Sequence, residues 1–435
     1  MQSPLTNADT LFEQLLQDLP PETLQLAREF KAFVRAQKVK TPEQLLRLVL
    51  LYCGLDKPLR EVAGTFTVLY ESLTDQSVAE RLRACGPWVK AMLGQMLPMA
   101  AVARLPEGLR FVVIDASSIQ APGAKGTDHR LHISMDLVSL QFIDVLVSDV
   151  HTGETLKHFT LGPGDVALTD RGYAQAQGMS DAVKRGAALI VRLNPFSVVL
   201  CDATGQPLSL SDALKRQKTE TIRTLEVVIQ ASDGKDEVRG WVHAYRLSTE
   251  QAGRARQKCR QRHKKGTPKV KTLYLAGWVL VFTTLAPEVL SAETIMRLYR
   301  CRWQGELAIK RWKSVLDVDA LRAKARSPLA EVWLHGTLRY ALLLERRMQR
   351  QLGDSWGRLD QERVVTWWRI WGMLKDEIAP MVTGSLFWQD EAWAACMKVL
   401  AERPRRRKLP QLPPEVVAVL SHSDQRQKEG RPIAA

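Results

Sequence analysis

Residues 111–115 read Phe-Val-Val-Ile-Asp, a short apolar run that ends in a carboxylate. Residues 166–170 repeat the pattern as Val-Ala-Leu-Thr-Asp, and 55 positions separate the two aspartates. Such runs are typical of buried strands, and open α/β sheets keep their sites at the carboxyl ends of strands. A carboxylate at a buried strand end is costly unless it has a partner. We therefore expect Asp115 and Asp170 to lie on neighbouring strands and to belong to one site.

The hundred residues before these runs predict helices. Residues 41–44, Thr-Pro-Glu-Gln, combine a capping threonine, a proline at the first helical position and a glutamine at the capping-box position. Further helices are expected to begin at residues 57–63, at Thr74 and at Pro87, and residues 98–107 resemble a linker. Short helices joined by tight turns suit a helix-turn-helix-like DNA-binding module, but a plain helical bundle fits the same pattern.

Between the two aspartates, and after the second, the pattern is that of an α/β domain. Residues 132–138, 142–150 and 187–193 predict strands, and residues 175–185 predict a helix. Residues 195–272 differ, because within them residues 225–230 and 238–246 alternate as antiparallel strands do. They end in a strongly basic stretch, 254–271, which we interpret as a loop with nine Lys or Arg and no acid.

An apolar run then returns the chain to the sheet. We expect residues 273–285 to form one long strand, and the chain from residue 292 onward to be mostly helical. The tail at residues 403–408 is basic, and the prolines after it suggest an extended end.

The charge of the chain favours a polyanionic partner. Lys and Arg number 62 against 47 Asp and Glu, a formal net charge of +15. Phosphate contacts of such an excess supply most non-specific DNA affinity, although RNA or a membrane surface would also satisfy it. The six cysteines form no Cys-x-x-Cys pair, which argues against a disulfide scaffold or a zinc site. No secretory signal or membrane span is visible, so we expect a cytoplasmic protein.

A third carboxylate lies on a predicted helix downstream of the returning strand. At about 100° per residue, Tyr299, Arg302, Glu306 and Lys313 fall on one face of that helix. An ordinary solvated face would also place these residue types on one stripe. The two aspartates upstream and the nearby Trp303 favour a functional stripe instead.

At this point the sequence resembles a known family. The spacing Tyr299-x2-Arg302-x3-Glu306-x6-Lys313 matches the YREK signature of the IS4 family of DDE transposases. Residues 169–173, Thr-Asp-Arg-Gly-Tyr, resemble the second-aspartate motif of the family, and residues 114–117, Ile-Asp-Ala-Ser, resemble the first. Residues 130–132, Arg-Leu-His, resemble another common segment. The resemblance covers roughly residues 40–345.

The resemblance implies an α/β fold with an RNase H-like catalytic core, a β-rich insertion, and helical N- and C-terminal regions. The spacing agrees, because 136 positions separate Asp170 from Glu306 and require an inserted unit. We therefore predict a helical DNA-binding region at residues 1–105 and a first part of the core at residues 106–194. The insertion with the basic loop follows at residues 195–272. The second part of the core, with the Glu306 helix, is expected at residues 273–345, and a helical C-terminal region with the basic tail at residues 346–435.

The implied activity is cut-and-paste transposition that depends on Mg²⁺ or Mn²⁺. Asp115, Asp170 and Glu306 would be the catalytic residues and the metal ligands, since in-line phosphodiester chemistry uses two ions about 4 Å apart and hard ions prefer carboxylates. The first nucleophile would be water. By resemblance, the freed 3′-hydroxyl would then attack the opposite strand to form a hairpin, and finally the target DNA.

The remaining signature residues are expected to bind DNA. Arg302 and Lys313 would neutralise phosphates near the scissile bond, and Tyr299 would hydrogen-bond to one. Trp278 corresponds to a position where some family members stack a flipped base, but an ordinary core tryptophan is the competing interpretation. The expected partners are terminal inverted repeats and target DNA, bound by a homodimer assembled on DNA and associated with the bacterial nucleoid.

Two alternative functions use the same features. An RNase H-like nuclease without strand transfer would need the same three carboxylates, and only the reaction products would distinguish it. A domesticated DNA-binding protein without catalysis would bind transposon ends alone. The intact triad Asp115, Asp170 and Glu306 argues against that alternative, since a silenced copy has no reason to keep all three together.

Overall fold

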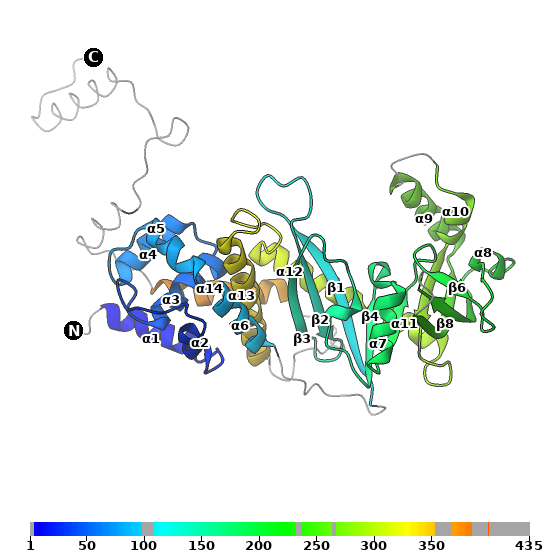
Figure 1. The fold of residues 1–435 in the computed structure, drawn as a ribbon, viewed down its shortest axis with the longest axis horizontal. Helices are drawn as coiled ribbons and strands as arrows, with labels where there is room; N and C mark the ends of the chain where they lie inside the picture. The colour runs from blue at the N-terminus through cyan, green and yellow to red at the C-terminus, as the bar shows by residue number, and fades with distance from the viewer. Residues whose placement is uncertain are drawn as a thin grey trace, which may run out of the picture.

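The computed structural model describes residues 4–97, 108–231, 236–262, 267–352, 367–384 and 399. A nine-stranded mixed sheet in the order β3-β2-β1-β4-β5-β9-β8-β7-β6 runs from the middle of the molecule to the end opposite the N-terminal helices (Figure 1). Its strands are β1 Arg110–Ile119, β2 His129–Asp136, β3 Phe142–Asp149, β4 Asp165–Thr169, β5 Ala188–Arg192, β6 Val199–Cys201, β7 Ile222–Gln230, β8 Glu237–Arg246 and β9 Trp278–Thr283.

The first five strands form the core that the sequence predicted. β1, β4 and β5 are parallel, while β2 is antiparallel to both β1 and β3. Helix α7 (Ala176–Lys184) lies in the connection from β4 to β5, as a parallel pair requires. This mixed α/β arrangement confirms the expected fold class, an RNase H-like core.

The strands from the insertion continue the same sheet. β9 pairs with β5 on one side and with β8 on the other, and β7 and β6 follow β8. The described residues of 195–272 therefore supply three strands, together with the short helix α8 (Leu210–Ala213). The prediction of a β-rich insertion is confirmed.

Two stretches of the insertion differ from the sequence analysis. The first half of the predicted basic loop, residues 254–262, belongs to helix α9 (Thr249–Arg262), because Arg, Lys, Gln and Ala are strong helix formers even without an apolar stripe. The predicted long strand at residues 273–285 is also wrong. Its beginning belongs to helix α10 (Val270–Leu275), and only Trp278–Thr283 forms a strand. A short apolar run fits a buried helix as well as a strand.

The N-terminal helices agree with the prediction. The Thr41 hydroxyl accepts a hydrogen bond from the Gln44 amide at 3.3 Å, and the Gln44 side chain accepts one from the Lys40 amide at 2.7 Å. The elements are α1 Pro4–Leu16, α2 Thr23–Glu29, α3 Pro42–Val49, the π-helical turn η1 Leu50–Gly54, α4 Leu59–Leu69, α5 Asp75–Arg83 and α6 Gly86–Met96. The predicted linker at residues 98–107 lies outside the described residues.

The C-terminal half of the chain joins these helices to the sheet. Its helices are α11 Ala292–Cys301, α12 Trp303–Leu316, α13 Pro328–Leu352 and α14 Trp367–Thr383. Helix α13 packs against α6 and η1, and α12 packs against β1 (Figure 1). The basic tail at residues 403–408 lies outside the described residues.

The two faces of the sheet have separate cores, and this separation decides where side chains point. In β1, Phe111 and Val113 join the core shared with α12 and α13, while Val112 and Ile114 join the core on the other face. Because successive side chains of a strand alternate between faces, Asp115 follows Val113 toward α12.

Candidate active site

Asp115 and Asp170 lie at the same level on neighbouring strands. The parallel pairing of β1 with β4 runs from Arg110 opposite Asp165 to Val113 opposite Leu168, an offset of 55 positions. The two aspartates are also 55 positions apart, so continuing the register sets them opposite each other just beyond the last paired residues. Equal spacing in sequence and in register is what allows the two carboxylates to share one site.

Asp115 does not end its strand, which corrects the sequence analysis. β1 continues to Ile119 because β2 pairs with it along that length. Only the ladder with β4 ends at Val113. Asp115 is therefore a buried strand residue, 9% exposed, beside the open edge left where β4 stops.

Glu306 is in the first turn of α12, which approaches β1 very closely at Gly305. A Cβ atom on Gly305 would lie 2.8 Å from Val113 Cγ1 and 3.5 Å from Asp115 Cβ. A glycine is thus needed for the helix to reach this position. The close approach brings the carboxylate of the next residue toward Asp115.

Arg302 connects these two carboxylates. Its Nη1 lies 3.3 Å from Asp115 Oδ2, and its Nη2 donates a hydrogen bond to Glu306 Oε1. Burial raises the pKa of Asp115 to about 6, with smaller contributions from Asp170 and Glu306, although Arg302 and the Ala116 amide oppose the increase. The Arg302 side chain is only 14% exposed.

Asp170 is held from its own side of the site. Its carboxylate accepts a hydrogen bond from the Gly172 amide at 2.8 Å, at the start of the 3-10 turn η3 (Arg171–Tyr173). A Cβ on Gly172 would lie 1.8 Å from Glu154 Oε2, so the Glu154 carboxylate packs directly on this glycine. The pKa of Glu154 is raised, first by burial and then by Asp170, while Arg130 lowers it. Sequence analysis missed Glu154 because it lies in a loop without any motif.

The Arg-Leu-His segment supports the site from β2. His132 is buried beside Ser148, with its Nε2 2.7 Å from the Ser148 hydroxyl, and its ring centroid lies 5.0 Å from that of His158. Burial lowers the pKa of His132 to about 4, which keeps the ring neutral near pH 7. This segment is part of the packing behind Asp115.

The Tyr299–Lys313 stripe does not lie on a single helix, contrary to the prediction. α11 ends at Cys301 and α12 begins at Trp303, so Arg302 is the junction residue between them. Tyr299 is in the last turn of α11, and the Arg302 guanidinium lies 5.9 Å from its ring centroid. Lys313 lies near the other end of α12, where it pairs with Asp319 at 3.3 Å.

Trp278 is a core residue in this structure, 2% exposed at the start of β9. Its ring centroid lies 5.9 Å from that of Tyr274, and the Arg246 guanidinium lies 5.8 Å from its centroid. Stacking on a base would require the side chain to become exposed, so that role stays a prediction. Trp303, by contrast, is 48% exposed and carries Lys310 over its ring at 4.3 Å.

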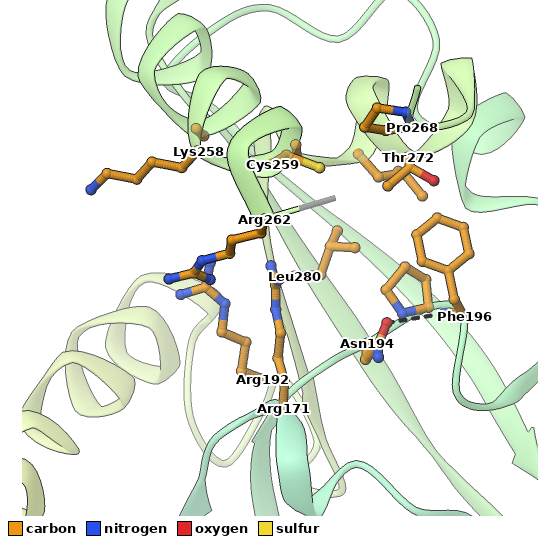
Figure 2. A pocket seen from close by; sticks show the side chains of 14 residues that line it. Arg171, Arg192, Asn194, Phe196, Lys258, Cys259, Arg262, Pro268, Thr272 and Leu280 are labelled. Atoms are coloured by element: carbon orange, nitrogen blue, oxygen red, sulfur yellow. Dashed lines mark hydrogen bonds between the residues drawn. The ribbon is translucent and has the colours of Figure 1, made fainter. Parts of the chain in front are cut away.

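A cationic cavity of about 430 Å³ has Arg171, the residue after Asp170, in its lining. Arg171 from η3, Arg192 from β5, and Lys258 and Arg262 from α9 line it, and its lining includes no acidic residue. Figure 2 shows the three guanidinium groups gathered at one side of the cavity, with Asn194 and Phe196 at the other. The pKa of Arg171 is lowered, first by burial and then by Arg192. We name these four cations the cationic pocket.

The described residues hold no group of three His, Cys, Asp or Glu side chains that could bind a metal ion as they stand. The chemistry of the donors nevertheless fits one. Oxygens of Asp115 and Glu306 already converge on a single cation, the Arg302 guanidinium. Carboxylate oxygens are the ligands that hard divalent ions prefer.

A sheet with two level carboxylates and a third acid on the adjoining helix defines an RNase H-like enzyme of phosphodiester chemistry. The family model described as a transposase DDE domain matches residues 106–341. The chain belongs to the DDE transposases, within the IS4 family, and is an insertion sequence transposase.

The similarity to known transposases covers more of the chain than that domain. The putative transposase InsL for insertion sequence element IS186A of Escherichia coli K12 is 31% identical over 342 residues, which are 77% of this chain and 92% of that protein. The transposase for IS421 of Escherichia coli gives 31% over 343 residues, with the same coverage. That for IS231F of Bacillus thuringiensis subsp. israelensis gives 25% over 379 residues, 75% of this chain and 77% of that protein.

Transposases of this family bind transposon DNA and generally use a divalent metal. The comparisons favour transposition over the two alternatives, since these three relatives are insertion sequence transposases. No helix in the described ranges has both the length and the apolar character to span a membrane.

Proposed function

We propose that Asp115, Asp170 and Glu306 are the catalytic carboxylates and that together they hold Mg²⁺ or Mn²⁺. The observation that carries this proposal is the shared cation, because Arg302 already contacts carboxylates from β1 and α12. The level register of β1 and β4 supports Asp170 as the third ligand. Bound divalent ions would activate the attacking oxygen and stabilise the leaving one.

The chain's own residues then perform the remaining work on DNA. The cationic pocket binds the phosphate backbone of one DNA strand, since its side chains face a cavity whose lining includes no acidic residue. Tyr299 and Arg302 line a second cavity of about 620 Å³ with Arg192 and Arg300, and hold a phosphate beside the scissile bond. Lys313 neutralises a neighbouring phosphate after leaving Asp319. Water is the first nucleophile, and the freed 3′-hydroxyl is the next.

The test replaces each carboxylate by its amide. Asp115→Asn, Asp170→Asn and Glu306→Gln should each abolish cleavage of a duplex that carries the terminal inverted repeat, while binding of the duplex remains. Asp149→Asn is the matched control, because Asp149 is an exposed carboxylate at the end of the nearby strand β3. Mg²⁺-dependent cleavage by any of the three variants would contradict the assignment.

A second test separates transposition from hydrolysis without joining. A labelled transposon end should appear covalently joined to target DNA, and a hairpin should form at the donor end. A nuclease would release ends that are never joined. Short terminal inverted repeats on both sides of the gene would agree with the first outcome.

We propose that helix α5, in the N-terminal helical region of the chain, recognises the base sequence of the terminal inverted repeat. Its Gln76, Glu80 and Arg83 side chains are exposed, while Val78 and Leu82 face the core. Alanine at the three exposed positions should reduce the preference for repeat over random DNA by about tenfold or more, the discrimination expected of lost base contacts. An unchanged preference would exclude α5 from base recognition. We further propose that the protein is a homodimer on DNA and is associated with the nucleoid.

A further inference from the structure

Arg302 occupies the centre of the candidate active site. Its guanidinium contacts Asp115 at 3.3 Å and also Glu306, so one cation links a strand residue and a helix residue. All three side chains are largely buried, with exposed fractions of 14%, 12% and 31% for Arg302, Asp115 and Glu306. The contact therefore belongs to the interior of the site and is only partly screened by water.

The oxygens that Arg302 contacts are the ones that a divalent ion would use. Because like charges repel strongly at short distance in a buried site, a guanidinium and a divalent ion cannot both sit between Asp115 and Glu306. Arg302 must withdraw before an ion can bind these two carboxylates. In the DNA-free protein, the arginine and the metal therefore compete for the same position.

The surroundings of Arg302 offer it another position. Its Nε atom is buried and has no hydrogen-bond partner, so the guanidinium is not fully satisfied where it lies. It also lines the cavity of about 620 Å³, where Arg192, Arg297 and Arg300 add positive charge against one acid, Glu293. A phosphate is the anion that such a lining favours, and arginine binds phosphate in a planar, bidentate manner.

We propose that Arg302 blocks metal binding in the DNA-free transposase and that a DNA phosphate in the adjoining cavity releases the block. The phosphate draws the guanidinium away, and Asp115 and Glu306 become available to the ion. Loading of the metal then follows engagement of the DNA end, which protects against cleavage before the DNA is in place. This inference rests on the proposed function, because it takes Asp115 and Glu306 as metal ligands.

The test measures metal binding instead of catalysis. Mn²⁺ binding to the DNA-free, full-length protein is measured by titration calorimetry for wild type, Arg302→Gln and the control Arg300→Gln. Arg300 is exposed, lines the same cavity and makes no contact with the carboxylates. Arg302→Gln should bind Mn²⁺ about tenfold or more tightly than wild type, since it removes a close positive charge. Arg300→Gln should stay near wild type. Equal affinity of wild type and Arg302→Gln would overturn the proposal.

Arg302→Lys provides a second variant if the glutamine variant does not fold. A lysine keeps the charge but can contact only one carboxylate closely. The Mn²⁺ affinity of Arg302→Lys should therefore lie between the affinities of wild type and Arg302→Gln. Affinity equal to wild type in a folded Arg302→Lys protein would contradict a block that depends on both contacts.

The DNA-dependent step is read by iron-directed cleavage of the protein backbone. Fe²⁺ replaces the metal, and ascorbate with peroxide generates radicals that cut the chain near the bound ion. Wild type should be cut near residue 115 only when the terminal-repeat duplex is present, whereas Arg302→Gln should be cut with or without it. Cutting of wild type to the same extent without DNA would overturn the proposal.

One further variant distinguishes this inference from the proposed function. Asp115→Asn and Glu306→Gln are added to Arg302→Gln, and the Mn²⁺ titration is repeated. Loss of the tight site shows that the metal uses these carboxylates and supports the block. Retention of the tight site would mean that the proposed metal ligands are wrong, whatever Arg302 does. Tight binding by wild type that is lost on removing the carboxylates would instead refute the block alone.

Discussion

The acidic residues and the cationic pocket differ in how their charges are matched. Asp115 and Glu306 share Arg302, and Asp170 accepts a hydrogen bond from Gly172. The pocket cations have no acid among their lining residues and, in the described part of the chain, no ion pair. Asp170 and Arg171 are adjacent in sequence, so one peptide bond separates the two regions. The DNA-free protein thus pairs Asp115 and Glu306 with its own arginine, and it leaves the four pocket cations without an ion pair among the described residues.

The largest expected effect is on DNA affinity and concerns the four basic side chains of the cationic pocket. In this variant, Gln replaces Arg171, Arg192, Lys258 and Arg262 together. The negative slope of log affinity against log salt concentration should become less steep by about 3 to 4, since each lost phosphate contact reduces its magnitude by about 0.9. Affinity should fall alike for specific and random duplexes. Fluorescence anisotropy over a range of salt concentrations measures both quantities.

The matched control removes four exposed cations that already have partners. These residues, each paired with a carboxylate, are Lys184, Lys215, Arg239 and Arg254. Their replacement by Gln should change the salt slope much less. Equal effects of the two quadruple variants would mean that local pairing does not decide which cations bind DNA.

A smaller effect is expected where the acids are assembled. Gly305→Ala would bring a Cβ to 2.8 Å from Val113 Cγ1, so α12 must shift away from β1. Overpacking of this kind costs about 1–3 kcal/mol of unfolding free energy, and the shift should also slow cleavage by moving Glu306 from Asp115. Urea denaturation and an end-cleavage assay measure the two effects.

Gly94→Ala in helix α6 is the control for that variant. A Cβ at Gly94 meets no atom within 4 Å, so this change should be neutral or stabilising by up to about 1 kcal/mol. If Gly305→Ala behaved like Gly94→Ala in both assays, close packing of α12 on β1 would not be what positions Glu306.

The smallest effect concerns the ionisation of Asp115 in the absence of divalent ions. Its pKa is raised from 3.8 to about 6, mainly by burial, so the folded protein binds this proton more tightly than the unfolded chain. Wild type should therefore lose stability as the pH rises from about 4 to 6. Asp115→Asn should escape this loss and exceed wild type by about 1–3 kcal/mol at pH 7.5.

Denaturant titrations of both proteins at pH 4 and pH 7.5 measure that difference. The stability gain of Asp115→Asn should be greater at the higher pH. A variant that is less stable than wild type at pH 7.5 would show that the contact with Arg302 outweighs the burial of the carboxylate.

Sequence patterns predicted the core of the fold well. Apolar runs identified β1, β4 and β5, and the equal spacing of Asp115 and Asp170 anticipated neighbouring strands. The capping residues at Thr41 and Thr74 gave helix starts that the structure confirms. These features depend on local residue types, which is why a single sequence contains them.

Other features depended on contacts between distant residues. Arg192 and Arg262 come from β5 and α9, so no local pattern shows that they meet in one pocket. Glu154 lies against Gly172 only because a loop folds back on η3. The Arg302 contact with Asp115 joins residues 187 positions apart. The signature indicated that Arg302 and Glu306 belong to a site, but it did not indicate that Arg302 neutralises Asp115 and Glu306.

The continuity of the sheet gives the insertion a mechanical role. Hydrogen-bonded ladders run without interruption from β8 through β9 and β5 to β4, which ends beside Asp170. Helix α9 begins at Thr249, three residues after β8 ends, so backbone hydrogen bonds of the sheet connect the start of this helix to the strand that precedes Asp170. Under the proposed function, tension on a DNA strand held by Lys258 and Arg262 would therefore reach the strands that carry Asp115 and Asp170 through the sheet itself.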